Sequence, residues 1–231
     1  MTDHAVILAR LARLAAANAR DRHLAERLCE ACRLILSVDA ASITVSNDSA
    51  SRITLAATNQ LAARLEDLQD VLGEGPCHDA FRTGQPAVVD FDEETGRRWP
   101  EFSRAARAEA GAGSVKCFAM RPGKQVFGTL SLYMSSTPQA AESDETAQFL
   151  ADAVGAALLR DPSNEAGVTD SGAWSSRAAI HQATGMVIAQ LRLGPDDALA
   201  ILRAHAYAHE TTLAEIAELV VARRLDFSQG D

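Results

Sequence analysis

The sequence predicts an α+β domain, with an antiparallel sheet flanked by helices, followed by an all-α domain of three helices. In the first part, segments with apolar residues at helical spacing alternate with short strand-like runs, whereas after residue 172 only helical spacing remains. Between the two parts, residues 161–172 are rich in Pro, Ser, Asn, Gly and Asp, which is the composition of a linker. We therefore expect a first domain over 1–160, a second over 173–226 and a tail over 227–231.

Composition and charge limit the classes of function. The chain is 47% hydrophobic and 23% charged, as in ordinary globular proteins, and its formal net charge is −9. That charge argues against broad nonspecific nucleic-acid binding, because phosphate contacts need clustered Lys and Arg. No apolar run approaches the roughly 18–20 residues that span a bilayer, and the first ten residues lack the features of a signal peptide. We expect a cytoplasmic protein without membrane contact.

Two helices and a hairpin are predicted to open the first domain. Apolar residues at helical spacing predict helices over 5–17 and 21–38, with Asp21 as the cap or first-turn acid of the second. Two strand-like runs, 41–46 and 52–58, enclose a short polar turn. Such a turn between alternating segments predicts a β-hairpin.

A glycine-rich loop divides the first domain. Asn59 is placed to cap a helix that ends at Leu72, because two glycines and a proline within residues 73–76 break the helical pattern. The elements predicted after this loop are a short helix over 76–83, a strand over 85–89, a helix over 100–110, two antiparallel strands over 114–120 and 126–134, and a helix over 142–159.

This order of elements resembles a GAF domain over most of residues 20–160. The resemblance rests on Leu72-Gly73-Glu74-Gly75-Pro76 before a short helix, on the strand Val126 to Tyr133 and on the closing helix. It implies an α+β GAF-like domain that senses a ligand or dimerises, with a pocket between the sheet and residues 71–110. The side chains that this interpretation places around an unknown small molecule are Glu74, Cys77, His78, Trp99 and Phe102.

A purely structural interpretation of the same residues stays open. In it, Trp99 and Phe102 fill space over the sheet, and Glu74 caps a helix or faces water. Cys77 with His78 superficially resembles the bilin attachment site of some GAF domains, but the Gly-Glu-Gly-Pro context is typical of the ordinary turn of this fold. We therefore expect no cofactor.

The four cysteines raise the question of metal or thiol chemistry. Cys29 and Cys32 lie within a helical pattern, and no second ligand pair at zinc spacing follows, so we interpret them as packed apolar groups and expect no metal. Cys77 and Cys117 leave an enzyme alternative open, because some small GAF-like proteins reduce free methionine sulfoxide with paired cysteines. Cys117 lies in an apolar strand, where cysteines are usually buried and inert. No catalytic motif is found, and we expect no enzyme.

The second domain is predicted as three helices with short connections. The first runs to Leu193 and ends at Gly194, the second begins with Pro195, and Thr212-x-x-Glu215 forms a capping box at the start of the third. The positions expected to face the core are Ile180, Ala183 or Thr184, Val187, Leu191, Leu199, Leu202, Ala206, Leu213, Ile216, Ala217 and Val220.

A second stripe on the first of these helices consists of Ala178, Gln182, Gly185 and Ala189. Glycine inside a helix costs about 1 kcal/mol relative to alanine. That cost suggests that something approaches the helix closely at Gly185, either a neighbouring helix or an RNA backbone.

The run from Ala178 to Val187, together with Leu202-Arg203-Ala204 and Leu213-x-x-Ile216-Ala217, resembles the ANTAR domain, a three-helix RNA-binding module of bacterial antiterminators. The resemblance implies binding to a pair of stem-loops in nascent transcripts, which prevents a terminator hairpin from forming. RNA loops expose unstacked bases to polar and stacking side chains. The residues that we assign to RNA binding on this basis are Arg177, His181, Gln182, Gly185, Arg203 and Thr211.

Charge alone does not predict RNA binding by the second domain. Residues 173–225 hold five arginines and five acidic residues, so their net formal charge is zero with His neutral. This balance favours the alternative of a signalling adaptor that uses the three helices for protein contacts. The family's aromatic residue after the Ala of the second helix is Leu199 here. Because two stem-loops need two readers, we expect a homodimer, with apolar helical faces supplied by 5–38 and 142–160.

Overall fold

The structure is a computed structural model that describes residues 4–17, 22–46, 52–91, 95–135, 142–161, 172–209 and 211–228, without the side chains of 95, 96, 172–178 and 196. The predicted cap Asp21, the hairpin turn 47–49 and most of the predicted linker lie outside the described residues. The chain divides into two compact units, one made of 1–69 with 74–165 and one made of 70–73 with 166–231.

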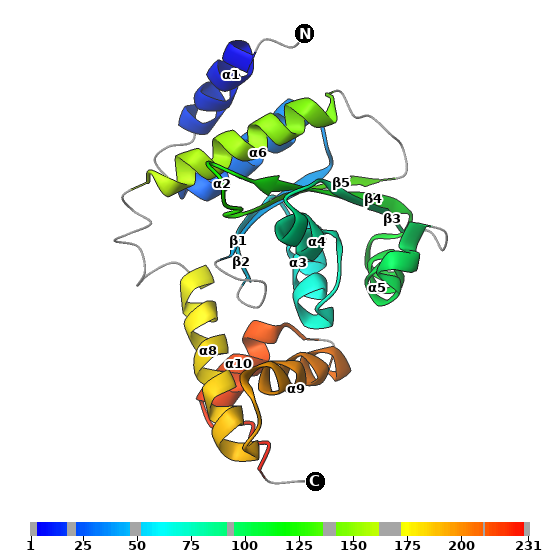
Figure 1. Cartoon of the computed structure of the whole chain (residues 1–231), viewed down its shortest axis with the longest axis vertical. Coiled ribbons are helices and arrows are strands. Elements are labelled where there is room, and N and C mark those ends of the chain that lie inside the picture. The colour runs from blue at the N-terminus through cyan, green and yellow to red at the C-terminus, as the bar shows by residue number, and fades with distance from the viewer. Residues whose placement is uncertain are drawn as a thin grey trace. The chain divides into compact units, whose positions relative to one another are not determined.

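A five-stranded antiparallel sheet organises the first unit, as predicted (Figure 1). Its strand order is β2-β1-β5-β4-β3, so the two hairpins β1–β2 and β4–β5 meet at the centre through β1 and β5. The strands are β1 (Ala40–Ser46), β2 (Arg52–Ala57), β3 (Ala87–Asp90), β4 (Gly113–Met120) and β5 (Gly128–Ser135). The strand predicted to begin at residue 85 begins at Ala87, directly after Pro86, which has no backbone N–H to give to a ladder.

Helices cover both faces of this sheet (Figure 1). On one face lie α2 (Leu24–Leu36) and α6 (Asp144–Leu159), and α1 (His4–Ala17) packs against both of them. The predicted second helix starts later than expected, because His23 is extended, with φ −63° and ψ 154°. Ser143 caps α6 by accepting the backbone N–H of Thr146.

The other face carries the segments around the glycine loop. These are α3 (Gln60–Leu72), α4 (Pro76–Thr83), the short 3-10 helix η1 (Thr95–Arg98) and α5 (Pro100–Ala110). The predicted cap Asn59 accepts the backbone N–H of Ala62 at 2.8 Å. Gly73 and Gly75 adopt φ values of 65° and 143°, where side chains are strained, so the turn between α3 and α4 needs both glycines.

Three helices form the second unit: α8 (Gly172–Leu191), α9 (Pro195–Ala208) and α10 (Leu213–Val221). The expected end of the first helix at Gly194 is wrong. Arg192 takes a left-handed φ of 57° and ends α8, while Gly194 is the extended N-cap of α9. Pro195 accounts for the extended backbone of Gly194, because proline disfavours helical backbone at the residue before it. The residues that these three helices contribute to the buried core are Ala183, Val187, Ala198, Leu199, Leu202, Ala206, Leu213, Ile216, Ala217 and Val220.

In the part of the chain that the structure describes, every helix is too short or too polar to cross a membrane.

Candidate functional site

A buried carboxylate lies at the centre of the first unit. Glu66 on α3 is 0% exposed. Its Oε1 accepts hydrogen bonds from Ser42 Oγ and Tyr133 OH, both at 2.8 Å. Its Oε2 accepts from Arg52 Nη2 at 2.9 Å and from Thr44 Oγ1 at 3.1 Å. A charge in an apolar interior is tolerated only when it is paired and hydrogen-bonded, and these four donors meet that condition.

Electrostatics keep Glu66 ionised. Burial by itself raises the pKa of this carboxyl, but the charge of Arg52 and hydrogen bonds from side chains including Ser42 and Tyr133 lower it, and the net pKa lies below the usual 4.5. Tyr133 shifts in the opposite sense. Burial first, and then the charge of Glu66, raise the pKa of its phenol well above 10.0, so that Tyr133 stays a neutral donor.

Two thiols lie beside the carboxylate. The Sγ atoms of Cys77 on α4 and Cys117 on β4 are 2.8 Å apart, and Cys77 Sγ also lies 2.9 Å from Ser131 Oγ. Cys77 Sγ donates to Glu66 Oε1 at 3.4 Å and accepts from Gln69 Nε2 at 3.1 Å. Both cysteines are 0% exposed and free. Burial is the main cause that raises the pKa of Cys117 well above 9.0.

The glycine turn brings Cys77 to this place. The N-cap of α4 is Gly75, which has no side chain to accept the N–H groups of the first turn. Gln69 Oε1 on α3 accepts the backbone N–H of Cys77 at 2.8 Å instead. A Cβ at Gly75 would lie 2.4 Å from that same oxygen. The glycine therefore lets α3 approach the turn closely enough for Gln69 to cap α4.

His78 connects the cluster to Arg52. Its Nε2 lies 3.3 Å from Arg52 Nη1 and 2.9 Å from the backbone oxygen of Gln69. Because Arg52 also pairs with Glu66, the chain of contacts runs from β2 through Arg52 to both α3 and α4. His78 is half-buried, whereas the other titratable side chains of this polar cluster are buried. Those buried side chains are Arg52, Glu66, Cys77, Cys117 and Tyr133.

The other three residues of the predicted pocket lie at the start of α5. Glu74 Oε1 accepts the backbone N–H of Phe102 at 2.8 Å and so caps that helix. Trp99 packs beneath the guanidinium of Arg98, 4.9 Å from the ring centroid, and Phe102 meets Phe91 edge to face at 6.2 Å. Cys77 and His78 thus join the polar cluster, whereas Glu74, Trp99 and Phe102 form a second group around a helix cap.

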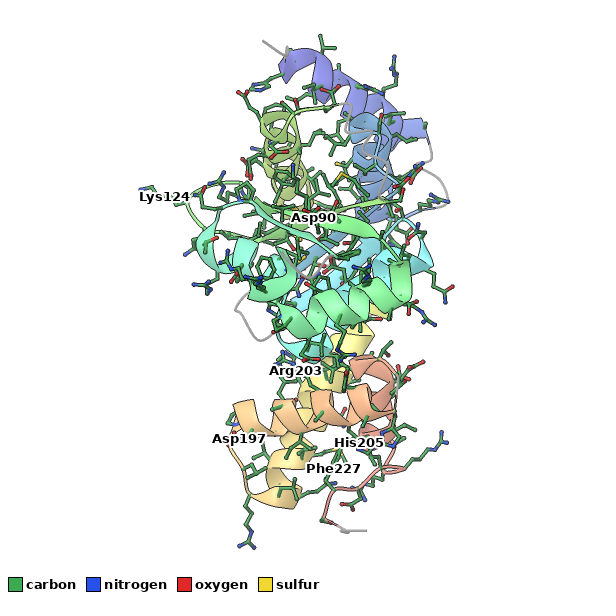
Figure 2. The ribbon with its side chains drawn as sticks, turned by 90° about the vertical axis from the view of Figure 1, so that its right-hand side faces the viewer. Asp90, Lys124, Asp197, Arg203, His205 and Phe227 are labelled. Carbon is green, nitrogen blue, oxygen red and sulfur yellow. The ribbon has the colours of Figure 1, made fainter. Side chains whose placement is uncertain are left out.

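In the second unit, three of the residues assigned to RNA lie on the exposed side of α8. His181, Gln182 and Gly185 are exposed, whereas Ala183 and Val187 on the opposite side are buried. Arg203 is half-buried on α9 (Figure 2). Arg177 belongs to α8, but its side chain lies outside the described ones.

Thr211 takes part in the cap of α10. Its Oγ1 donates to Glu215 Oε2, and the same oxygen accepts the backbone N–H of Thr212 at 3.1 Å. Thr212 Oγ1 accepts the N–H of Glu215 at 3.1 Å, which completes the predicted capping box. The hydrogen bond from Thr211, followed by that from the Thr212 backbone, lowers the pKa of Glu215.

The comparison with known families decides the identity of both units. A family model described as GAF domain matches residues 20–159, and another described as ANTAR domain matches residues 171–221. The chain belongs to the GAF family and carries an ANTAR domain. GAF domains are sensory, and ANTAR domains are found in RNA-binding antiterminators.

Several solved GAF domains have similar folds. One is from a phosphoenolpyruvate-protein phosphotransferase of Coxiella burnetii, at 15% identity and a TM-score of 0.48, covering 71% of this chain and 99% of that one. The GAF domain of the Acinetobacter phosphoenolpyruvate-protein phosphotransferase has 14% identity, a TM-score of 0.47 and coverages of 72% and 99%. An A. aeolicus GAF domain in an inactive state has 12% identity, a TM-score of 0.48 and coverages of 68% and 97%. No curated protein matches the chain.

Sequence reasoning missed most of the polar cluster of the GAF domain. Arg52, Glu66, Ser131 and Tyr133 were not among the predicted site residues, although a signal for Glu66 exists. Ala62, Glu66 and Gln69 follow each other at helical spacing on the buried side of α3. An acid on such a face requires a buried partner, and Arg52 begins the preceding strand.

The surroundings of Gly185 show what does not approach it. Among the described residues, no heavy atom outside the helix's own backbone lies within 4 Å of a Cβ built at Gly185. No helix that the structure describes therefore approaches Gly185. Gln182 and Ala189, the neighbours of Gly185 in the predicted stripe, are exposed as well.

Proposed function

We propose that this protein is a signal-responsive transcription antiterminator. Its ANTAR domain binds a pair of stem-loops in a nascent transcript and prevents termination, while its GAF domain senses a signal or dimerises. The observation that carries the proposal is the exposed stripe of α8 around Gln182 and Gly185, inside a domain that matches the ANTAR family. Binding to nascent RNA would place the protein in the cytoplasm.

The exposed stripe is suited to close contact with an RNA loop. Gly185 presents backbone without a side chain, and nothing in the described part of the chain covers it. The side-chain amide of Gln182 can both donate and accept hydrogen bonds, as recognition of the edges of unstacked bases requires. With zero net formal charge over 173–225, binding would depend on these specific contacts more than on a broad phosphate-binding surface.

A gel shift with an RNA that carries two hexaloop stem-loops tests the proposal. Wild-type protein should bind, and Gln182→Ala should bind about tenfold or more weakly, because an RNA polar group loses its partner. Gln85→Ala is the matched control, since Gln85 is an exposed glutamine of the GAF domain. Failure of the wild type to bind at low salt, where phosphate contacts are strongest, would overturn RNA binding.

That failure would favour the adaptor alternative. The charge balance of 173–225 is the observation that supports it, since a neutral helical surface suits a protein partner. An adaptor would keep its fold in Gln182→Ala and would show no affinity for either one or two stem-loops.

We further propose that the GAF domain is not an enzyme. Methionine sulfoxide reduction needs a thiol that the substrate reaches, and both Cys77 and Cys117 are 0% exposed in this fold. A thiol-dependent sulfoxide reductase assay with wild type and Cys117→Ser tests this. Turnover by the wild type that disappears in the variant would contradict the proposal.

A further inference from the structure

The two buried thiols of the GAF domain are arranged for chemistry with each other. Cys77 Sγ and Cys117 Sγ lie 2.8 Å apart, and a disulfide requires about 2.05 Å. The sulfurs therefore need to move less than an ångström toward each other. We propose that Cys77 and Cys117 form a reversible disulfide, so that the pair is an oxidation site of the GAF domain for hydroperoxides.

Burial selects the class of oxidant. Both cysteines are 0% exposed, and they lie behind Glu66, Gln69 and Ser131, which contact their sulfurs. A bulky disulfide such as oxidised glutathione would need a large opening to reach them. Hydrogen peroxide is close to water in size and needs only a small local opening.

The elements that carry the two cysteines, β4 and α4, determine which thiol reacts first. Cys117 lies in β4, which pairs with β3 on one side and β5 on the other. Cys77 lies in the first turn of the eight-residue helix α4, directly after the two-glycine turn. Because an opening at the start of a short helix breaks fewer contacts than one in a paired strand, Cys77 is the first to react.

Both steps balance. Cys77 Sγ attacks one peroxide oxygen, the O–O bond breaks, the thiol proton moves to the departing oxygen, and water leaves a sulfenic acid on Cys77. Cys117 Sγ then attacks the Cys77 sulfur, the S–O bond breaks, and the hydroxyl leaves as water with the Cys117 proton. In total, with hydrogen peroxide as the oxidant, two thiols are oxidised to one disulfide while one hydrogen peroxide is reduced to two waters. An external dithiol reverses the change by thiol–disulfide exchange.

The disulfide would constrain the glycine turn between α3 and α4. It joins residues 40 apart in sequence and ties the start of α4 to β4. It also removes the S–H through which Cys77 donates to Glu66. Glu74, three residues before Cys77, caps α5, so the turn that the disulfide anchors also contacts the next helix.

The test reads the thiols of the full-length protein directly. Reduced protein is treated with excess hydrogen peroxide, denatured and alkylated, and its peptides are analysed by mass spectrometry. Two of the four cysteines should become unreactive, with one Cys77–Cys117 linked peptide pair about 2 Da lighter than the sum of its parts. Dithiothreitol should restore all four.

Cys29 and Cys32 provide the internal control. They are also buried and free, and burial raises the pKa of Cys32 to about 12. They should remain alkylatable. In Cys117→Ser, dimedone should trap a sulfenic acid on Cys77, and Cys32→Ser should behave as wild type. Four reactive cysteines after peroxide treatment, or a link that involves Cys29 or Cys32 instead, would overturn the proposal. RNA is absent from the assay, so either outcome leaves the proposed antitermination function unaffected.

Discussion

At the scale of single residues, the buried pair of Glu66 and Arg52 is the most exacting feature of the GAF domain. The side chains of Arg52 and Glu66 are 3% and 0% exposed, and their closest atoms are 2.9 Å apart. Removing one member of such a pair leaves the other charge buried without compensation, which costs about 3–5 kcal/mol. The fold therefore needs both members of the pair together, although the intact pair adds little net stability.

We expect Glu66→Gln to lower the free energy of unfolding by about 3 kcal/mol, because Arg52 loses its counter-charge while the hydroxyl donors keep a partial acceptor. Urea denaturation measures the change. Glu101→Gln is the control, since Glu101 pairs with Arg104 on the surface with side chains 57% and 62% exposed, and it should change stability by less than about 1 kcal/mol. Equal losses in the two variants would show that the buried pair has no special role.

The stabilising effect of Glu66 should also depend on pH. Its folded pKa lies below the unfolded value of 4.5, so its ionised form stabilises the fold above pH 4.5, and this contribution is lost as pH falls through the folded pKa. The stability difference between wild type and Glu66→Gln should therefore be constant near neutrality and shrink below pH 4.5. Urea denaturation at a series of pH values checks this. A difference that grows toward acid would contradict the direction of the shift.

At the scale of elements, local patterns predicted the helices and the sheet, but of the polar cluster only Cys77 and His78 were among the predicted site residues. Helical spacing, capping residues and glycine turns act within a few residues, which is why α3, α6 and α10 were predicted close to their observed bounds. The polar cluster depends on contacts between distant residues, such as Glu66 with Tyr133, 67 positions apart. No local pattern encodes that pairing. Only the acid on the buried face of α3 hinted that a partner exists.

Helix α8 allows stability and RNA binding to be separated. In Gly185→Ala the new methyl group meets no heavy atom of the described chain within 4 Å, and alanine favours the helix by about 1 kcal/mol. We therefore expect the variant to melt at a higher temperature. If RNA backbone approaches α8 at this position, the same variant should bind the two-stem-loop RNA more weakly.

Thermal melting and a gel shift on the same preparation measure both effects. Gly123→Ala is the matched control, because Gly123 is an exposed glycine of the GAF domain and a Cβ there also meets no described heavy atom within 4 Å, so this variant should bind RNA as the wild type does. A Gly185→Ala protein that is more stable and binds RNA as well as the wild type would remove Gly185 from the interface.

At the scale of the whole molecule, the expected homodimer rests on exposed apolar surface. Leu8 in α1 is 43% exposed, and the exposed alanines Ala5, Ala12 and Ala16 share its side of the helix at helical spacing. The opposite side of α1 is buried through Ile7, Leu11 and Ala15. An exposed apolar stripe on a helix whose opposite side is packed is the kind of surface that a second copy of the chain covers.

Leu8→Lys should therefore convert a dimer into a monomer, as measured by sedimentation equilibrium, because a charge at the centre of the stripe cannot be buried without a partner. Val88→Lys is the control, since Val88 is 51% exposed on the edge strand β3, and it should leave the association state unchanged.

Dimerisation should also strengthen the proposed RNA binding. Two linked ANTAR domains should bind a two-stem-loop RNA more tightly than one domain binds a single stem-loop, by about 10²–10⁴-fold when both sites engage together. Leu8→Lys should abolish that excess while keeping the affinity for a single stem-loop. A wild-type protein that is monomeric, yet shows the full excess, would mean that the two stem-loops bring the chains together.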